Sequence, residues 1–401
     1  AIALRPGLAD AHNNLGNSLC ARRQFGEAEA AFRTAVALDP ARAAAHSNLS
    51  TALTGLRKYA PAAAASRKAL ELDPDLAPGY FTLGNALAGL GKRGEAVAAW
   101  RTAVALQPGN PEAHYYLGNG LREIGRGREA EAAYRAVIAL EPGHAQAHTN
   151  LGSVLLARGR GDDAEAAWRT AIAHKPDLPE PHMNLGLRFR DRFQFAEAAA
   201  AFEAAAAYLP DDSALRDQAR RYHRQCARFA ALDARLPALL GGTETPAGGA
   251  ERVAFAELCH FKRHYATAAR LYRDAFAAEP GLADAVPTFA RYNAACGAAL
   301  ARCGRGADAG SLDEAGRAAW GRQALAWLRQ DLEWWSRTLD GGDARARAQV
   351  QQKMRHWQAD PDLAGVRGVL ALARLPGGEC EQWTRLWSDV AALLRRAGEP
   401  E

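Results

Sequence analysis

The sequence predicts an all-α protein, a right-handed superhelix of α-helical hairpins that ends in a helical C-terminal cap. Three patterns in the sequence recur with one period and lead to this prediction. They are a proline, a leucine followed by a small residue, and an alanine followed four residues later by an aromatic residue in most repeats. The prolines recur every 34 residues, at Pro6, Pro40, Pro74, Pro108, Pro142, Pro176 and Pro210. A fixed period of this length is typical of a solenoid, in which each unit buries its apolar face only against its neighbours.

Residues 80–108 illustrate the repeating unit. Leu83 and Gly84 lie in a first helix, and Ala96 and Trp100 lie in a second. The small residues let two antiparallel helices approach, and the aromatic ring one turn later fills the space beside their contact. Pro108 has no amide hydrogen to donate, so we expect it to follow the last turn of the second helix.

This pattern resembles the tetratricopeptide repeat (TPR) over residues 9–212, as six complete repeats of two helices each. The second repeat departs from the others, because Ser66 stands where they have an aromatic residue. A more regular departure concerns the tryptophan that the family usually has within the first helix. Here that position is His12, His46, Tyr80, His114, His148 or His182. We expect these side chains to pack between the two helices of each hairpin.

The remaining residues divide into five further segments. Residues 1–8 match the end of a second helix, so the chain begins within a repeat, and we expect it to be a piece of a longer protein in which Ile2 and Leu4 have lost their partners. After the repeats, the pattern predicts one long helix, a linker rich in glycine and proline, degenerate TPR-like units and a tryptophan-rich helical cap. These segments are residues 213–236, 237–250, 251–312 and 313–401.

The C-terminal half carries a second resemblance. The stretches RYNAACGAALARCGRG, QALAWLRQDL, VQQKMRHWQADPDLAGVR and LWSDVAALLRR are similar to the tail of large bacterial serine/threonine protein kinases that carry TPR arrays. The similarity covers about residues 213–397. It implies a non-catalytic tail with a kinase domain upstream. The chain itself has no HRD catalytic loop, no DFG motif and no glycine-rich loop ahead of a lysine, so no residue is assigned to phosphoryl transfer.

Composition restricts the partners and the compartment. The net charge of +5 is small, and the arginines are interspersed with acidic residues, which argues against a nucleic-acid-binding surface. No apolar run reaches the roughly 20 residues that a membrane span requires. The six cysteines are scattered and form no CxxC pair, which favours a reducing, cytoplasmic setting. We expect no cofactor, no metal and no small-molecule substrate.

Several chemical motifs favour a structural interpretation. The GRG triplets, such as Gly125–Gly127, follow no strand and are interpreted as turns rather than phosphate loops. His144 with His148, and Cys259 with His260 and His264, offer too few ligands for zinc. Cys296 and Cys303 have no nearby histidine and acid pair and are interpreted as buried apolar residues. Trp320, Trp327 and Trp334 could form a docking patch, although core packing is favoured.

Asparagines give the positive signal for function. Asparagine is a mediocre helix former, so its return on one face of successive first helices needs a reason. Four occupy one repeat position, which Thr82 and Tyr116 interrupt, and three occupy the position three residues later. The candidate peptide-binding residues are Asn14, Asn17, Asn48, Asn85, Asn119, Asn150 and Asn184. The alternative is a solvated face inherited with the repeat.

The NLG pattern around these asparagines resembles the TPR arm of the eukaryotic O-linked N-acetylglucosamine transferase. That resemblance implies asparagines lining a concave groove that holds an extended peptide. An asparagine amide can both donate and accept, so it can bind peptide backbone with little regard to sequence. We therefore expect a scaffold that binds a protein or peptide in this groove, as the recruitment or regulatory tail of a bacterial serine/threonine kinase. A substrate-selecting arm of a glycosyltransferase, or a self-sufficient enzyme or metal protein, is the alternative.

Overall fold

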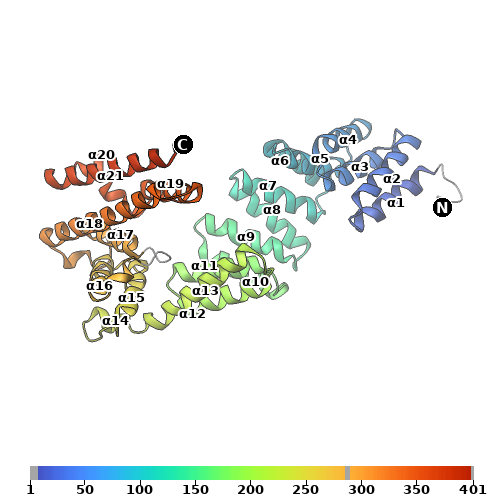
Figure 1. Ribbon diagram of the computed structural model, residues 1–401. Coiled ribbons are helices and arrows are strands. Elements are labelled where there is room, and N and C mark those ends of the chain that lie inside the picture. The colour runs from blue at the N-terminus through green and yellow to red at the C-terminus, as the bar shows by residue number, and fades with distance from the viewer. Residues whose placement is uncertain (1–7, 285–289, 399–401) are drawn as a thin grey trace. The chain divides into compact units, whose positions relative to one another are not determined.

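The computed structural model describes residues 8–284 and 290–398, and every regular element within these ranges is a helix (Figure 1). The predicted all-helical fold class is therefore confirmed. Residues 1–7, with Ile2 and Leu4, lie outside the described residues. The chain divides into two compact units. Unit 1 comprises residues 1–192 and 197–223, and unit 2 comprises residues 193–196 and 224–401.

The repeat array consists of successive helix pairs, as predicted. The first helices of the pairs, called A helices, are α1 (Ala9–Ala21), α3 (Ala43–Gly55), α5 (Ala77–Gly89), α7 (Pro111–Glu123), α9 (Ala145–Ala157) and α11 (Pro179–Asp191). The second, called B helices, are α2 (Phe25–Leu38), α4 (Tyr59–Leu72), α6 (Arg93–Leu106), α8 (Gly127–Leu140), α10 (Gly161–His174) and α12 (Phe195–Tyr208). The turn glycines Gly125 and Gly159 have φ of 76° and 78°, a conformation that glycine adopts without strain.

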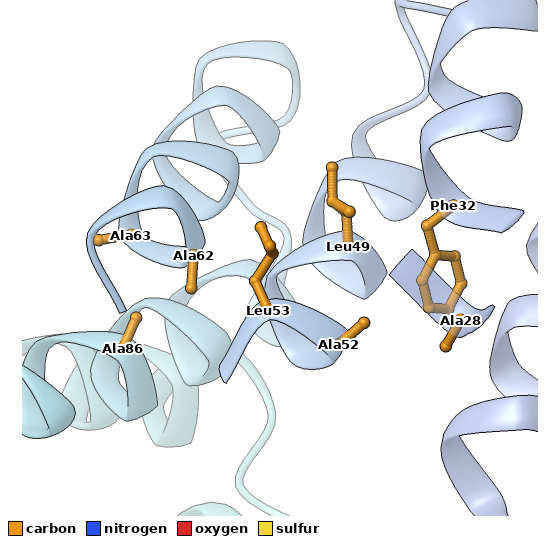
Figure 2. Packing of buried hydrophobic residues seen from close by; sticks show 8 residues of the cluster. All are labelled: Ala28, Phe32, Leu49, Ala52, Leu53, Ala62, Ala63 and Ala86. Atoms are coloured by element: carbon orange, nitrogen blue, oxygen red, sulfur yellow. The ribbon is translucent and has the colours of Figure 1, made fainter. Parts of the chain in front are cut away.

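A glycine in the A helix and an aromatic ring in the B helix hold most pairs together. A Cβ atom on Gly84 would lie 2.5 Å from the Trp100 ring, and one on Gly152 would lie 2.4 Å from the Trp168 ring. Any side chain on these glycines would therefore displace the aromatic ring. The core that results is shown for the first repeats in Figure 2, where Phe32 lies beside Ala28, and leucines and alanines of α3 to α5 continue the same cluster.

The second repeat replaces this contact by buried hydroxyl groups. The Ser66 hydroxyl of α4 bonds to Ser50 Oγ at 2.7 Å and to Thr82 Oγ1 at 2.9 Å, and Thr82 Oγ1 lies 3.3 Å from Ser47 Oγ. Ser50 and Ser66 are fully buried. Because these side chains are small, α5 packs closely against α3.

The histidines of the A helices have a hydrogen-bonding role in addition to the predicted packing role. His46, His114, His148 and His182 each bond through Nε2 to the carbonyl oxygen of the proline six residues earlier, at 2.9 to 3.0 Å. A carbonyl oxygen only accepts, so Nε2 carries the hydrogen. The predicted packing between paired helices is confirmed for two of them, because the rings of His148 and His182 each lie 5.8 Å from a ring of the B helix in the same pair, His174 and Tyr208. Each of the four also ties the start of an A helix to the carbonyl just beyond the preceding B helix.

Unit 2 continues with helices of less regular length. After α13 (Ala214–Asp233), which contributes to both units, they are α14 (Leu236–Leu240), α15 (Gly249–Phe261), α16 (Tyr265–Ala278), α17 (Ala290–Arg302), α18 (Glu314–Asp340), α19 (Ala344–Ala359), α20 (Val369–Leu372) and α21 (Gly377–Gly398). Three short 3₁₀ helices are also present. They are η1 (Pro280–Leu282), η2 (Ala309–Ser311) and η3 (Pro361–Val366).

Two of the predicted boundaries differ from the structure. The predicted linker begins at residue 237, but residues 236–240 form the short helix α14, in which Leu236 and Leu239 are buried. The long helix α18 packs along α17 and takes the place of a B helix, so the predicted boundary at residue 312 falls inside a hairpin. Of the tryptophan flank, Trp327 is buried and Trp320 and Trp334 are half-buried, so full core packing is found for Trp327 alone.

Candidate functional site

Three of the predicted asparagines link neighbouring A helices. Asn48 Nδ2 donates to Asn13 Oδ1 at 3.0 Å, and Asn184 Nδ2 lies 3.5 Å from Ser153 Oγ. Asn150 Nδ2 donates to Asn119 Oδ1 at 3.0 Å and to the Tyr115 hydroxyl at 3.2 Å. All three are half-buried. These amides therefore stabilise the stacking of repeats, a role that the sequence did not predict.

Two other predicted asparagines line a pocket beside α5. The pocket has a volume of about 360 Å³ and lies among the third repeat, α3, α4 and α7. We call it the amide pocket. It is lined by Thr54, Tyr59, Asn85, Ala88, Gly89, Arg93, Ala96, Trp100, Tyr116, Asn119, Gly120 and Glu123. The exposed residues Asn14 and Asn17 in α1 do not line it.

Asn85 is held by the aromatic residue of its own hairpin. The Trp100 indole Nε1 donates to Asn85 Oδ1 at 3.0 Å, across 15 residues of sequence. Trp100 is buried, and Asn85 is half-buried. The oxygen of this amide is therefore occupied from within, and its amino group is the part left for a ligand.

Asn119 is held in the same way by the next hairpin. The Tyr134 hydroxyl donates to Asn119 Oδ1 at 2.7 Å, and Asn150 Nδ2 donates to the same oxygen. Burial raises the pKa of Tyr134 to about 12, so the phenol keeps its proton at neutral pH. Asn119 Oδ1 thus has two donors, and its amino group is again the part left for a ligand.

The remaining lining of the amide pocket is aromatic with a few polar groups. The Trp100 and Tyr116 rings lie 5.9 Å apart, and Phe81 packs edge-on against Tyr116 at 5.4 Å. Burial raises the pKa of Tyr116. The Thr54 hydroxyl oxygen is buried and has no hydrogen-bond partner within residues 8–284 and 290–398. Arg93 Nε and Glu123 Oε2 form an exposed ion pair at 2.9 Å.

The lining residues other than the asparagines were not identified from the sequence. One signal could have found them. A B-helix aromatic that can donate a hydrogen bond coincides with an asparagine 15 residues earlier at Trp100 with Asn85 and at Tyr134 with Asn119. The pattern occurs in two hairpins, and each of them contributes one asparagine, Asn85 or Asn119, to the pocket.

In unit 2, the residues of the second resemblance serve packing. The Tyr292 hydroxyl donates to Asp360 Oδ2 at 2.7 Å, joining α17 to the end of α19. His260 Nε2 contacts Asp362 Oδ2 at 3.1 Å. Cys296 is buried, and burial raises the pKa of its thiol well above the usual value, so it stays protonated and is a poor nucleophile.

The histidine pair in α9 is used within the protein. His144 Nδ1 accepts the backbone N–H of Ala147 at 3.1 Å, and His148 Nε2 bonds to the Pro142 carbonyl. Throughout the described part of the chain, no cluster of three or more histidine, cysteine and acidic side chains is arranged to hold a metal ion. Nor does any helix in that part combine the length and the apolar character of a membrane span.

Comparisons with known proteins agree with the repeat pattern. Models described as tetratricopeptide repeat match residues 9–42, 43–76 and 117–179, and a model described as TPR repeat matches residues 84–120. No curated protein sequence matches the chain.

Among solved structures, MamA is 26% identical, with a TM-score of 0.38, and the match covers 40% of this chain and 94% of MamA. YrrB, described as a TPR protein with an unusual peptide-binding site, is also 26% identical, with a TM-score of 0.38 and coverage of 45% and 93%. PilF of Pseudomonas aeruginosa is 18% identical, with a TM-score of 0.47 and coverage of 53% and 96%. From the family models and the helix pairs together, we conclude that residues 9–76 and 84–179 of the chain form tetratricopeptide repeats.

Proposed function

We propose that the protein is a scaffold that binds an extended peptide segment of a partner protein on the face formed by its A helices, with the amide pocket as the main contact. The observation that carries this proposal is the pocket itself, where Asn85 and Asn119 lie together with the rings of Trp100 and Tyr116. A concave site with aromatic walls and a few placed polar groups is typical of ligand binding.

The size of the pocket fits part of a peptide. About 360 Å³ is at the lower end of the range for small-ligand sites, which suits one or two residues of a chain that continues along neighbouring A helices. The aromatic rings would contribute apolar contact, and the amides would bind backbone atoms. The predicted residues Asn14, Asn17, Asn48, Asn150 and Asn184 are then secondary contacts along the same face or links between repeats.

The kinase-tail assignment stays a prediction about the parent protein. Neither the family models nor the solved structures bear on it, and the residues that carry it, such as Tyr292 and Asp360, contact each other within unit 2. The glycosyltransferase-arm alternative also stays a prediction. Both are compatible with a peptide-binding array.

Filling the amide pocket tests the proposal. Peptides would be selected from a displayed library on the full chain, one would be synthesised, and its dissociation constant would be measured by calorimetry. Ala88 lines the pocket and is exposed, so Ala88→Trp obstructs the pocket without removing an internal hydrogen bond. We expect at least about tenfold weaker binding, the equivalent of about 1.4 kcal/mol.

Ala88→Ser is the matched control and should bind like the unmodified protein. Circular dichroism would establish that both variants are folded. The proposal is contradicted if no library peptide binds the chain, or if the tryptophan variant binds a selected peptide as tightly as the serine variant.

A further inference from the structure

We propose that Trp100 and Tyr134 are positioning residues, which fix the amides of Asn85 and Asn119 so that the amide pocket donates hydrogen bonds and accepts none through these two side chains. Its ligand groups would then be acceptors, the backbone carbonyl oxygens of the bound peptide. This inference rests on the proposed function, and it differs from the expectation that each asparagine both donates and accepts.

The indole nitrogen decides the orientation of Asn85. Nε1–H can only donate, so the atom 3.0 Å from it must be the amide oxygen. A rotated amide would place its amino group against Nε1–H, leaving a buried donor without an acceptor. Such a loss would leave the rotated form as about a sixth or less of the population.

Asn119 is held less strictly than Asn85, because a hydroxyl and an amide can each donate or accept, but in the structure both donate to its oxygen. Tyr134 Oη lies 2.7 Å away and Asn150 Nδ2 lies 3.0 Å away. Asn150 Nδ2 also contacts the Tyr115 hydroxyl, so this network extends into the next repeat. Within the described residues, no acceptor bonds to the Nδ2 group of Asn85 or of Asn119.

The other repeats do not combine these features. Trp168 donates to the backbone carbonyl of Thr149 at 3.0 Å, and the residue 15 positions before it is Ser153. Phe32 and Phe202 have no polar hydrogen to donate. The arrangement of a donor aromatic with an oriented asparagine therefore occurs in two adjacent hairpins, the third and the fourth, and both asparagines line one pocket.

Asn85→Asp separates the donor role from a structural role. The aspartate keeps an oxygen for Trp100 Nε1–H, so the internal bond survives, but the outward amino group becomes an oxygen that repels a carbonyl. The probe is a library-selected peptide without acidic side chains and with an amidated C-terminus. We expect at least about tenfold weaker binding at neutral pH, because a donor is lost and an acceptor faces an acceptor.

The pH dependence of this variant adds a second readout. Below the pKa of the new carboxyl, near about 4 for an unperturbed aspartate, the protonated group regains an O–H donor. Affinity of the aspartate variant should therefore recover as the pH falls from about 5 to about 3, while that of the unmodified protein should not improve. Gln107→Glu, at an exposed position just after α6 that does not line the pocket, controls for the added charge and should leave affinity within about twofold.

Trp100→Phe tests the positioning role directly. Without the indole N–H the Asn85 amide can rotate, so binding should weaken by about two- to tenfold through the cost of ordering it. Trp168→Phe removes the same group from the fifth repeat and is the matched control.

The inference is overturned if Asn85→Asp binds as tightly as the unmodified protein, or if the two phenylalanine variants bind equally. These results can occur even when Ala88→Trp abolishes binding, so they leave the proposed function standing.

Discussion

At the scale of single residues, the size of one B-helix side chain sets how closely neighbouring repeats approach. Ser66 stands where Trp100 stands one repeat later, and its hydroxyl joins Ser50 and Thr82. On one side of α5 these small groups allow close packing with α3. On the other side of α5, the rings of Trp100 and of Tyr116, which belongs to α7, lie between α5 and α7 and line the amide pocket.

Removing the Ser66 hydroxyl should therefore destabilise unit 1. Ser66→Ala leaves the buried hydroxyls of Ser50 and Thr82 with one partner fewer, at a cost of about 1–3 kcal/mol in the free energy of unfolding. Urea unfolding followed by circular dichroism measures this cost. Ser50→Ala with Ser66→Ala should cost less than the sum of the single changes, because the two hydroxyls bond each other. Additive costs would show that this bond contributes nothing.

A second residue-scale prediction concerns pH. Burial raises the pKa of Asp331 to about 6, although its ion pair with Arg291 at 3.0 Å opposes the shift. The folded state therefore holds this proton at a pH where the unfolded chain has released it. Stability of unit 2 should fall as the pH rises from about 4 to about 6, by no more than about 3 kcal/mol.

Unfolding of the full chain by urea, followed by tryptophan fluorescence at a series of pH values, checks this dependence. Seven of the nine tryptophans follow residue 319, so the signal reports mainly on unit 2. Asp331→Asn cannot titrate and should remove this part of the slope. An identical slope in that variant would refute the assignment.

The residues of the candidate site were only partly predictable from the sequence. The 34-residue period places Asn85 and Asn119 at one repeat position, which is enough to predict a shared face. It does not show that the Trp100 indole and the Tyr134 hydroxyl occupy the amide oxygens, because those contacts depend on the rotamers of side chains on another helix. For the same reason the bond of Asn48 to Asn13 was missed.

At the scale of elements, some helices of unit 2 depend on caps from distant residues. The first turn of α16 receives Asp308, whose carboxylate accepts the backbone N–H groups of Ala266 at 3.3 Å and Thr267 at 2.8 Å. The residue before that helix, His264, supplies no cap of its own. Helix α15 likewise uses Glu279, which accepts the N–H of Gly249 at 2.9 Å.

Asp308→Ala should destabilise unit 2 by about 1–2 kcal/mol, the usual cost of losing an N-terminal cap. Chemical unfolding monitored by tryptophan fluorescence provides the measurement. Asp308→Asn keeps one acceptor oxygen and should retain part of the stability. Equal stability of the alanine variant and the unmodified protein would mean that water satisfies these N–H groups equally well.

Helix identity was easier to predict than helix partnership. The spacing of Leu325, Leu328 and Leu339 predicted the long helix that is α18, and all three side chains are buried. Its role as the partner of α17 was not predictable, because its length and its tryptophans break the 34-residue pattern. Helix α17 is joined to α21 by an ion pair of buried Arg302 with Glu379 at 2.8 Å, between residues 77 positions apart.

At the scale of the whole molecule, the array predicts that binding is local. In a solenoid each repeat contacts its neighbours, so removing a terminal repeat lowers stability without unfolding the rest. Deleting residues 1–42 removes α1 and α2 and leaves every residue that lines the amide pocket. This truncated chain should bind a selected peptide within about threefold of the full chain, a change of less than 1 kcal/mol.

Deleting residues 1–76 instead removes Thr54 and Tyr59 from the pocket lining and should weaken binding markedly. Circular dichroism establishes whether each truncated chain keeps its helices. A loss of binding after removal of residues 1–42 alone, in a folded chain, would place the site nearer the N-terminus.

The most direct test of peptide binding at the amide pocket is to map where a bound peptide lies. A library-selected peptide carrying a photoreactive group would be irradiated with the full chain, and the crosslinked residues would be identified by mass spectrometry. The account predicts crosslinks concentrated in α5 and α7, near Ala88 and Tyr116, that vanish in the Ala88→Trp variant. Crosslinks confined to α1, α11 or unit 2, and unchanged by that substitution, would contradict it.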